Sequence, residues 1–294
     1  MEKQELQLEA IPKLDRISFD DFYNTYVKNQ KPVVVSHFID DWNAMSKWKL
    51  DYIKKIGGDK TVPLYDNREK VNTSKKKFNE PHLHMKLADY VDLLKKGPTP
   101  YRIFLYNLLK KVPKLQDDFY FPKVGLKFLK GLPMLFFGGE NSKVFMHYDI
   151  DYANILHFHF DGKKRCILYP PSQTKYLYKL PNALISHPDL DFNNPDFEKY
   201  PAIAKAKGLV TELQHGDMLY MPEGYWHQMT YLTPGFSMSL RAIPNRKFNL
   251  VKAVYNVFVM RYFDNFMRKL LGERWKSFKE EKALSRTNNM VLKV

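Results

Sequence analysis

His147 and Asp149 stand two positions apart in the segment HYDIDYAN (147–154), which has the character of a β-strand. Side chains alternate along a strand, so this imidazole and this carboxylate are expected to project from the same face. Both groups bind divalent metal ions, but one H-x-D pair is a weak signal because such pairs also occur as ordinary polar residues on a sheet. A third ligand is needed before a metal site can be inferred.

A third candidate ligand, His227, lies 80 residues further on in HGDMLYMPEGYWHQM (215–229), after a glycine turn and inside a second strand-like run. Two histidines and one carboxylate on one side of a metal ion leave the other positions open, as in non-haem Fe(II) oxygenases. Open positions are needed there because an oxidising co-substrate and dioxygen must both reach the iron. Strands suit this task because rigid neighbours fix the directions of the ligands.

Three zones of the chain supply the elements that would hold these residues. Up to about residue 135, helices mix with short strands: Ser18 is a suitable N-cap, residues 31–35 predict a buried strand, and residues 87–96 predict an amphipathic helix. From 135 to 245 the pattern is mostly β, with strand-like runs at 147–154, 154–160, 164–169, 217–221, 225–231 and 236–243. Asp161-Gly162 suits a tight turn and predicts a hairpin between 154–160 and 164–169.

The third zone is helical. Apolar residues recur at helical spacing from Leu250 to Leu271, Gly272 ends that helix, and residues 275–284 predict a second one. We therefore divide the chain into a domain at 1–245, with an N-terminal α/β embellishment, and a helical region at 246–294. An apolar helix pair after a complete β-domain either packs back on that domain or forms a homodimer interface, and the pattern does not separate the two.

The composition favours a cytoplasmic protein with one large domain, or one domain and an appendage. The 294 residues are 44% hydrophobic and 15% aromatic, which is enough to bury a sizeable core. No apolar run approaches the roughly 20 residues of a membrane span. The N-terminal MEKQELQLEAIPK lacks the apolar segment of a secretory signal. Cys166 is the only cysteine, so an intrachain disulfide is excluded and a reducing compartment is expected.

The formal net charge is +15, from 47 Lys plus Arg against 32 Asp plus Glu. Such an excess suits a nucleic-acid or ribosome partner, or another acidic substrate. The alternative is a general lysine bias with solvated side chains, since only short clusters occur, at 75–77, 110–111 and 163–165.

Several ordered motifs resemble the Jumonji-C, cupin-like 2-oxoglutarate oxygenases, and within that family the chain is similar to the asparaginyl hydroxylase of hypoxia-inducible factor. The resemblance lies in HYDIDYAN, in GKKRCILYPP (162–171), in FNNPDFEKYP (192–201) and in HGDMLYMPEGYWHQM. KPVVVSHFIDDW (31–42) also resembles the start of the family domain, so the likeness covers most of residues 15–245. Several motifs in the proper order are far more specific than H-x-D alone.

The resemblance implies a mainly β fold with flanking helices, namely a double-stranded β-helix (a jelly-roll, cupin-like barrel). It assigns His147, Asp149 and His227 to Fe(II), Lys164 to the distal carboxylate of 2-oxoglutarate, and Asn154 to a hydrogen bond near that co-substrate. A lysine inside a barrel also needs an anionic partner, because an isolated buried charge is costly. The alternative is an exposed Lys164 in the 163–165 cluster. The helical tail matches the place where relatives carry dimerising helices.

Some positions depart from the family pattern. Val144 stands where a threonine often binds the co-substrate, and Arg241 stands where relatives often have asparagine. An arginine there could clamp a carboxylate bidentately and supplement Lys164. Tyr106 could supply the family's tyrosine contact to 2-oxoglutarate, but Phe104 aligns about as well.

Two further features bear on the pocket. His157 and His159 share one face of a segment that is one residue longer than usual, so they either line the barrel or simply pack and hydrogen-bond; for His157 we expect the latter. Residues 180–208 form a long loop rich in Pro, Asn and Asp. Such a loop is expected near the mouth of the barrel, where it would contribute to substrate selection.

The expected activity is hydroxylation of a protein, RNA (tRNA or ribosome) or small-molecule substrate, with Fe(II) as cofactor and 2-oxoglutarate as co-substrate. Demethylation would be the same chemistry on an N-methyl group. Fold and ligand triad do not identify the substrate, because they are shared by hydroxylases of all these classes. Two alternatives remain open: a metal-binding cupin without oxygenase activity, and a nucleic-acid- or ribosome-associated binding module.

Overall fold

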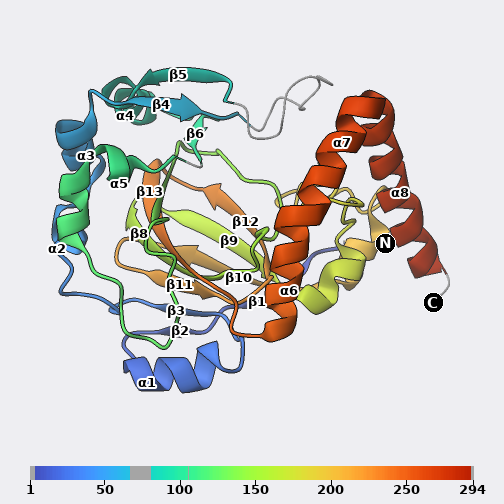
Figure 1. The fold of residues 1–294 in the computed structure, drawn as a ribbon, viewed down its shortest axis with the longest axis horizontal. Helices are drawn as coiled ribbons and strands as arrows, with labels where there is room; N and C mark the ends of the chain where they lie inside the picture. Colours follow the sequence, from blue (N-terminus) through green and yellow to red (C-terminus); the bar gives the residue numbers. More distant parts are fainter. Residues whose placement is uncertain (1–3, 67–80, 105, 293–294) are drawn as a thin grey trace.

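Two β-sheets face each other at the centre of the molecule, and helices flank them on both sides (Figure 1). The computed structural model describes residues 4–66, 81–104 and 106–292. The first sheet has the order β1 (Gln7–Ala10), β10 (Lys207–Leu213), β9 (Lys164–Tyr169), β12 (Trp226–Tyr231). The second has the order β2 (Lys13–Leu14), β3 (Val33–Val35), β11 (Met218–Met221), β8 (Asn154–Asp161), β13 (Gly235–Ala242), β7 (Met134–Gly138), β6 (Arg102–Ile103). The predicted mainly β jelly-roll with flanking helices is confirmed.

The predicted hairpin about Asp161-Gly162 is wrong. Strand β8 pairs with β11 and β13, whereas β9 pairs with β10 and β12 in the other sheet. The turn therefore carries the chain from one sheet to the other, as a double-stranded β-helix requires. Gly162 has φ +77°, and a Cβ there would meet the backbone of Pro234 at 2.2 Å, so the local signal marks a glycine-requiring corner.

Predicted features of the first zone are confirmed, whereas several strands were not predicted. Ser18 caps α1 (Phe19–Phe22) by accepting a hydrogen bond from Asp21 N at 3.1 Å, and α4 (Leu87–Lys96) ends before Gly97. The structure adds strand β10 and the small sheet of β4 (Thr61–Leu64) and β5 (Leu83–Lys86). The other short elements are η1 (Tyr23–Val27), α2 (Asn43–Lys47), α3 (Leu50–Gly57), α5 (Leu108–Lys111), η2 (Pro113–Asp118), η3 (Pro171–Tyr176) and η4 (Pro201–Lys205). The lysine cluster at 75–77 lies outside the described residues.

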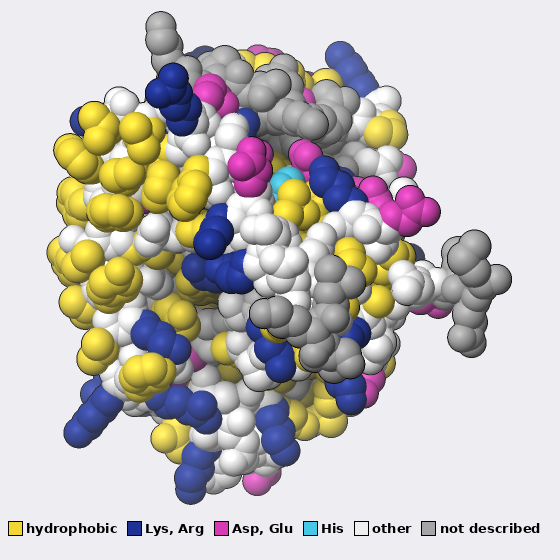
Figure 2. Space-filling model, turned by 90° about the vertical axis from the view of Figure 1, so that its right-hand side faces the viewer, with side chains coloured by type: hydrophobic (Ala, Val, Ile, Leu, Met, Phe, Trp, Pro, Cys, Tyr) yellow, Lys and Arg dark blue, Asp and Glu magenta, His cyan; other side chains and the backbone are white. Residues whose placement is uncertain are grey.

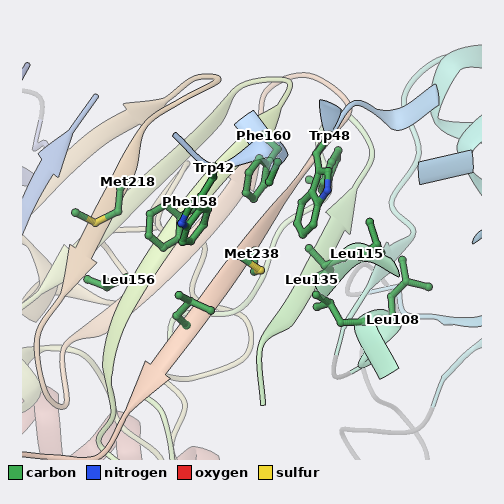
Figure 3. Packing of buried hydrophobic residues seen from close by; sticks show 14 of the residues in the cluster. Trp42, Trp48, Leu108, Leu115, Leu135, Leu156, Phe158, Phe160, Met218 and Met238 are labelled. Atoms are coloured by element: carbon green, nitrogen blue, oxygen red, sulfur yellow. The ribbon is translucent and has the colours of Figure 1, made fainter. Parts of the chain in front are cut away.

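Strand alternation sorts the core into layers. Ile155, Cys166 and Leu168 belong to a cluster inside the barrel, between the two sheets. The alternate residues of β8, Phe158 and Phe160, point outward and pack against Trp42 and Trp48 of the N-terminal segment (Figure 3). The side chains of β8 at 155, 157 and 159 therefore face the barrel interior.

The C-terminal helices follow the predicted order. One nearly continuous helix comprises α6 (Lys247–Tyr255), the π-turn η5 (Asn256–Met260) and α7 (Arg261–Leu271), and Gly272 with φ +53° ends it. Helix α8 (Glu273–Leu292) is longer than the predicted 275–284 and packs back on the body, where Tyr178 Oη donates to Asn288 Oδ1 at 2.5 Å. No helix in the described ranges is long and apolar enough to cross a membrane.

Candidate metal centre

His147, Asp149 and His227 converge. Each offers one ligand atom, and the three atoms lie within 4.8 Å of one another. His147 Nε2 is 4.0 Å from Asp149 Oδ1, and the two imidazole centroids are 4.2 Å apart. The backbones of the histidines pair reciprocally, with N–O distances of 3.1 Å and 2.7 Å, so the rings face each other across one antiparallel bridge.

We predicted a regular strand through 147–154, and this prediction is wrong. The three side chains converge for another reason. His147 forms isolated bridges to His227 and Ile185, and the chain turns directly after Asp149, where Tyr152 N donates to Asp149 O at 3.1 Å. Tyr152 takes φ +50°, a conformation that a non-glycine residue seldom adopts. A bridge and a turn therefore aim the two side chains at one point, and regular alternation starts only with β8.

The imidazoles are oriented for metal binding. His147 Nδ1 lies 2.8 Å from Phe145 O, and His227 Nδ1 lies 3.1 Å from Tyr225 O. A carbonyl oxygen only accepts, so each Nδ1 carries the proton and each Nε2 presents a lone pair to the centre. Burial, followed by the charge of His227, lowers the pKa of His147 to about 3, so this imidazole is neutral near pH 7.

Asp149 uses its two oxygens differently. Oδ2 accepts from Arg241 Nη1 at 2.9 Å, while Oδ1 faces His147. Burial acts to raise the pKa of Asp149, but the charge of Arg241, the two neighbouring histidines and the hydrogen bond from Arg241 together outweigh it, and the pKa falls to about 2. Two imidazoles and one ionised carboxylate are a donor set suited to Fe(II), so the residues present fit the predicted cofactor.

Lys164 lies inside the barrel, with 1% of its surface exposed. Its Nζ donates to Ser237 Oγ at 2.8 Å and to His157 Nε2 at 3.2 Å, and it lies 4.2 Å from the centroid of the Tyr231 ring. Among the described residues it forms no ion pair with a carboxylate. Burial lowers the pKa of Lys164 to about 7. A carboxylate bound next to this amine would favour its protonated, charged form.

Lys164 and the triad share one pocket wall. Lys164 is paired with Tyr231, and Leu168 is paired with His227. Roughly 13 Å of strand therefore separates the level of Lys164 from the level of the metal ligands. His157 also faces inward, with Nδ1 2.8 Å from Ser239 Oγ. It lies between the levels, since Lys164 and His227 both act to lower its pKa after the larger effect of burial. His157 thus both lines the barrel and hydrogen-bonds.

Arg241 lies at the metal end of the pocket but on the facing sheet, on β13. Its guanidinium pairs with Asp149 and with Asp151. The predicted role of Arg241 as a second clamp for 2-oxoglutarate stays a prediction, and these contacts do not favour it. Val144 is partly buried against the interior cluster, so its side chain adds no polar contact.

The structure does not bring Asn154 or Tyr106 to the triad. Asn154 points to the outer side of β8, where it accepts from Tyr220 Oη at 2.7 Å and donates to Glu223 Oε1 at 3.1 Å. Tyr106 lines a surface hollow with Lys60, between β4 and α5. Their predicted contacts to 2-oxoglutarate find no support in these positions.

The long loop lies next to the first histidine. Backbone hydrogen bonds of 3.0 Å join Tyr148 N to Leu184 O and Ser186 N to Met146 O. The loop is therefore close to the metal centre, as predicted, and its role in substrate selection stays a prediction. Its buried side chains, Phe192 among them, form a core cluster. Deleting the loop would therefore disturb the support of the metal centre.

Arg102 of β6 influences the site, but the sequence pattern did not identify it as a candidate residue. Its burial lowers its own pKa to about 10, and its charge contributes, after burial and His227, to the low pKa of His147. The signal was a single charged residue in the apolar run YRIF (101–104). Ser237, Ser239 and Asp151 were also missed, because their roles depend on contacts between distant strands.

These features define the class: a jelly-roll with an inward-facing His-Asp-His cluster that could hold a metal ion. A family profile described as "Cupin-like domain" matches residues 20–269, and the chain belongs to this family. The chain is 28% identical to "Jumonji C domain-containing protein 5" of Drosophila melanogaster, an alignment that covers 78% of this chain and 59% of that protein.

Two more relatives carry names that state different activities. "Lysine-specific demethylase 8" of Xenopus tropicalis is 26% identical over 78% of this chain and 52% of its own length. "tRNA wybutosine-synthesizing protein 5" of Gallus gallus is 26% identical over 78% of this chain and 76% of its own length. The resemblance to Jumonji-C proteins is confirmed. The chain spans little more than half the length of the fly and frog relatives.

Proposed function

We propose that this protein is an Fe(II)- and 2-oxoglutarate-dependent oxygenase that hydroxylates a protein or RNA substrate. One observation carries the proposal: a ready cation site and a buried lysine without a carboxylate partner lie on the same wall of one barrel. The triad would hold the iron, and Lys164 would bind the distal carboxylate of 2-oxoglutarate. Bound iron with this co-substrate supplies oxidation of a C–H bond by dioxygen.

The residues of the chain have three tasks in this reaction. The histidines and Asp149 fix the metal and leave its other positions accessible. Lys164 orients the co-substrate through a charge-assisted hydrogen bond, which is strong where water is scarce. The interior cluster, with Leu168 and Met229, excludes water around the reacting groups. Hydroxylation and demethylation of an N-methyl group require the same site, and we propose hydroxylation as the basic reaction.

Anaerobic reconstitution tests the proposal directly. Purified protein with Fe(II) and 2-oxoglutarate should show a metal-to-ligand charge-transfer band, and admission of air should yield succinate even without the substrate. Metal binding without the band or succinate would instead identify a metal-binding cupin without oxygenase activity, which the Val144 departure favours. A steep salt dependence of RNA binding would support an RNA substrate and relate the +15 charge to it.

We also propose a homodimer through α6 and α7, in a reducing, cytoplasmic compartment. The inner stripe of this helix is buried, with Asn256 against Ile150 and Asp264 against α8. The opposite stripe is apolar and exposed (Figure 2): Val251, Tyr255, Phe258, Tyr262 and Phe266. Phe258 is 67% exposed and Tyr262 66%. With neighbouring Phe248, Val254 and Leu270, the stripe presents roughly 1,000 Å², comparable to one side of a standard interface and more than most monomers expose.

Sedimentation tests this dimer. Phe258→Glu with Tyr262→Glu should convert a dimer into a monomer, whereas Leu132→Glu, which replaces an exposed apolar residue outside the helices, should not. A wild-type monomer that floats with lipid vesicles would assign the stripe to a membrane surface, and a monomer that does neither would contradict the dimer outright.

A further inference from the structure

Strand β13 carries three inward-facing side chains in a row, Ser237, Ser239 and Arg241. Ser237 contacts Lys164 and Ser239 contacts His157, whereas Arg241 occupies the metal end of the same row. Its strand partner is Ile155, a member of the interior cluster. Arg241 therefore projects into the mouth of the barrel from a regular, well-paired strand.

The guanidinium has two carboxylate partners. Nε donates to Asp151 Oδ2 at 3.3 Å and Nη2 donates to Asp151 Oδ1, which makes a forked, bidentate pair. Nη1 donates to Asp149 Oδ2 at 2.9 Å. The side chain of Arg241 is only 17% exposed, so these contacts are partly shielded from water. Binding a co-substrate carboxylate would require this arrangement to break.

Asp149 needs external support, because it lies in an irregular segment. The chain turns at Asp149–Tyr152, and no ladder of strand hydrogen bonds holds it there. Two contacts compensate: Arg241 reaches in from β13, and Asn256 Nδ2 of the π-turn donates to Ile150 O at 3.3 Å. Arg241 is the contact that reaches the ligand carboxylate itself.

We propose that Arg241 is a positioning residue for the metal ligand Asp149, with Asp151 as the anchor of the guanidinium. The fork to Asp151 fixes the plane of Arg241, and Nη1 then holds Asp149 Oδ2. Oδ1 is thereby presented to the metal as a single donor atom. This inference rests on the proposed function only in taking the triad as a metal site.

The position and the charge of Arg241 predict opposite effects of its removal on metal affinity. If Arg241 acted only through its charge, it would repel a divalent cation, and removing it would tighten metal binding. If it acts by position, removing it leaves Asp149 free to rotate away, and metal binding weakens. The second effect should dominate, because Asp151 already balances much of the guanidinium charge. Loss of an outer partner of a ligand typically costs about tenfold to a hundredfold in metal affinity.

The experiment is an anaerobic titration of the full chain with Co(II), followed by its d–d absorption, and then a titration of the Co(II)-saturated protein with 2-oxoglutarate. Arg241→Asn should weaken Co(II) binding by about tenfold to a hundredfold. Arg241→Lys should not restore it, because an ammonium cannot make the fork. Asp151→Asn should weaken it less. Arg268→Asn, at another ion-paired arginine, is the matched control and should have no effect.

Unchanged or tighter Co(II) binding by Arg241→Asn would overturn the proposal. So would a loss confined to 2-oxoglutarate affinity, which would make Arg241 a co-substrate anchor. Should Arg241→Asn fail to fold, judged by its melting curve in chelator, Arg241→Lys and Asp151→Asn decide the matter in the same titration. A wild-type protein that binds no Co(II) would contradict the proposed function instead, which separates the two failures.

Discussion

The two ends of the barrel pocket are built for opposite charges. At the metal end, the polar atoms of His147, Asp149 and His227 that do not face the centre are already engaged by backbone carbonyls or Arg241. At the other end, the partners of Lys164 are neutral: a serine, an imidazole and an aromatic ring. The ligands of the metal end are therefore oriented before a cation binds. At the other end, the amine of Lys164 becomes fully charged only when a carboxylate binds next to it. A metal and a dicarboxylate together satisfy both.

The largest effect is expected at the metal end. Asp149→Ala removes the one ionised ligand and should weaken Co(II) or Fe(II) binding by more than about a hundredfold, since loss of an outer partner alone can cost that much. Direct titration under nitrogen measures it, with exposed Asp20→Ala as the control. Metal binding that survives in Asp149→Ala would show that the triad is not the site.

Lys164→Ala should affect the opposite end alone. A charge-assisted hydrogen bond is worth roughly 1.5–3 kcal/mol, so the apparent affinity for 2-oxoglutarate should fall by about tenfold to a hundredfold. Metal affinity should stay the same. The neighbouring Lys163→Ala is the matched control, because Lys163 is exposed. Equal losses of metal and co-substrate would contradict the separation of the two ends.

The pH dependence follows from the lowered pKa of Lys164, about 7 in the free protein. Below pH 7 the ammonium is already present; above it the free protein holds a neutral amine that must take up a proton when the dicarboxylate binds. Affinity for 2-oxoglutarate should therefore fall as pH rises above 7, by up to about tenfold per pH unit. Calorimetry at pH 8 in buffers of different ionisation heat should show net proton uptake, which Lys164→Ala abolishes. Absence of uptake in the wild type would mean that Lys164 is charged before binding.

The same contrast explains what the sequence could predict. The metal ligands were found because their residue types and motif order are specific, and the pocket position of Lys164 was implied by the family resemblance. The pairing of β8 and β9 could not be found from Asp161-Gly162, because a turn signal is local and does not specify which sheet receives the next strand. The partners of Arg241 and Asn154 depend on an irregular turn and on the outer face of β8, which no periodic pattern describes.

The smallest effect is expected for His157, which connects the two ends. Burial, with the charge of Lys164, lowers the pKa of His157 far below its usual range, so the ring is neutral and its Nε2 accepts from Lys164. His157→Phe removes one acceptor and should reduce 2-oxoglutarate affinity by about threefold to tenfold, the value of one buried hydrogen bond. A double-mutant cycle measures the connection, because His157→Phe should have little further effect once Lys164 is alanine. Equal losses in both backgrounds would show that His157 acts on the pocket independently of Lys164, through Ser239 and the strand that it holds.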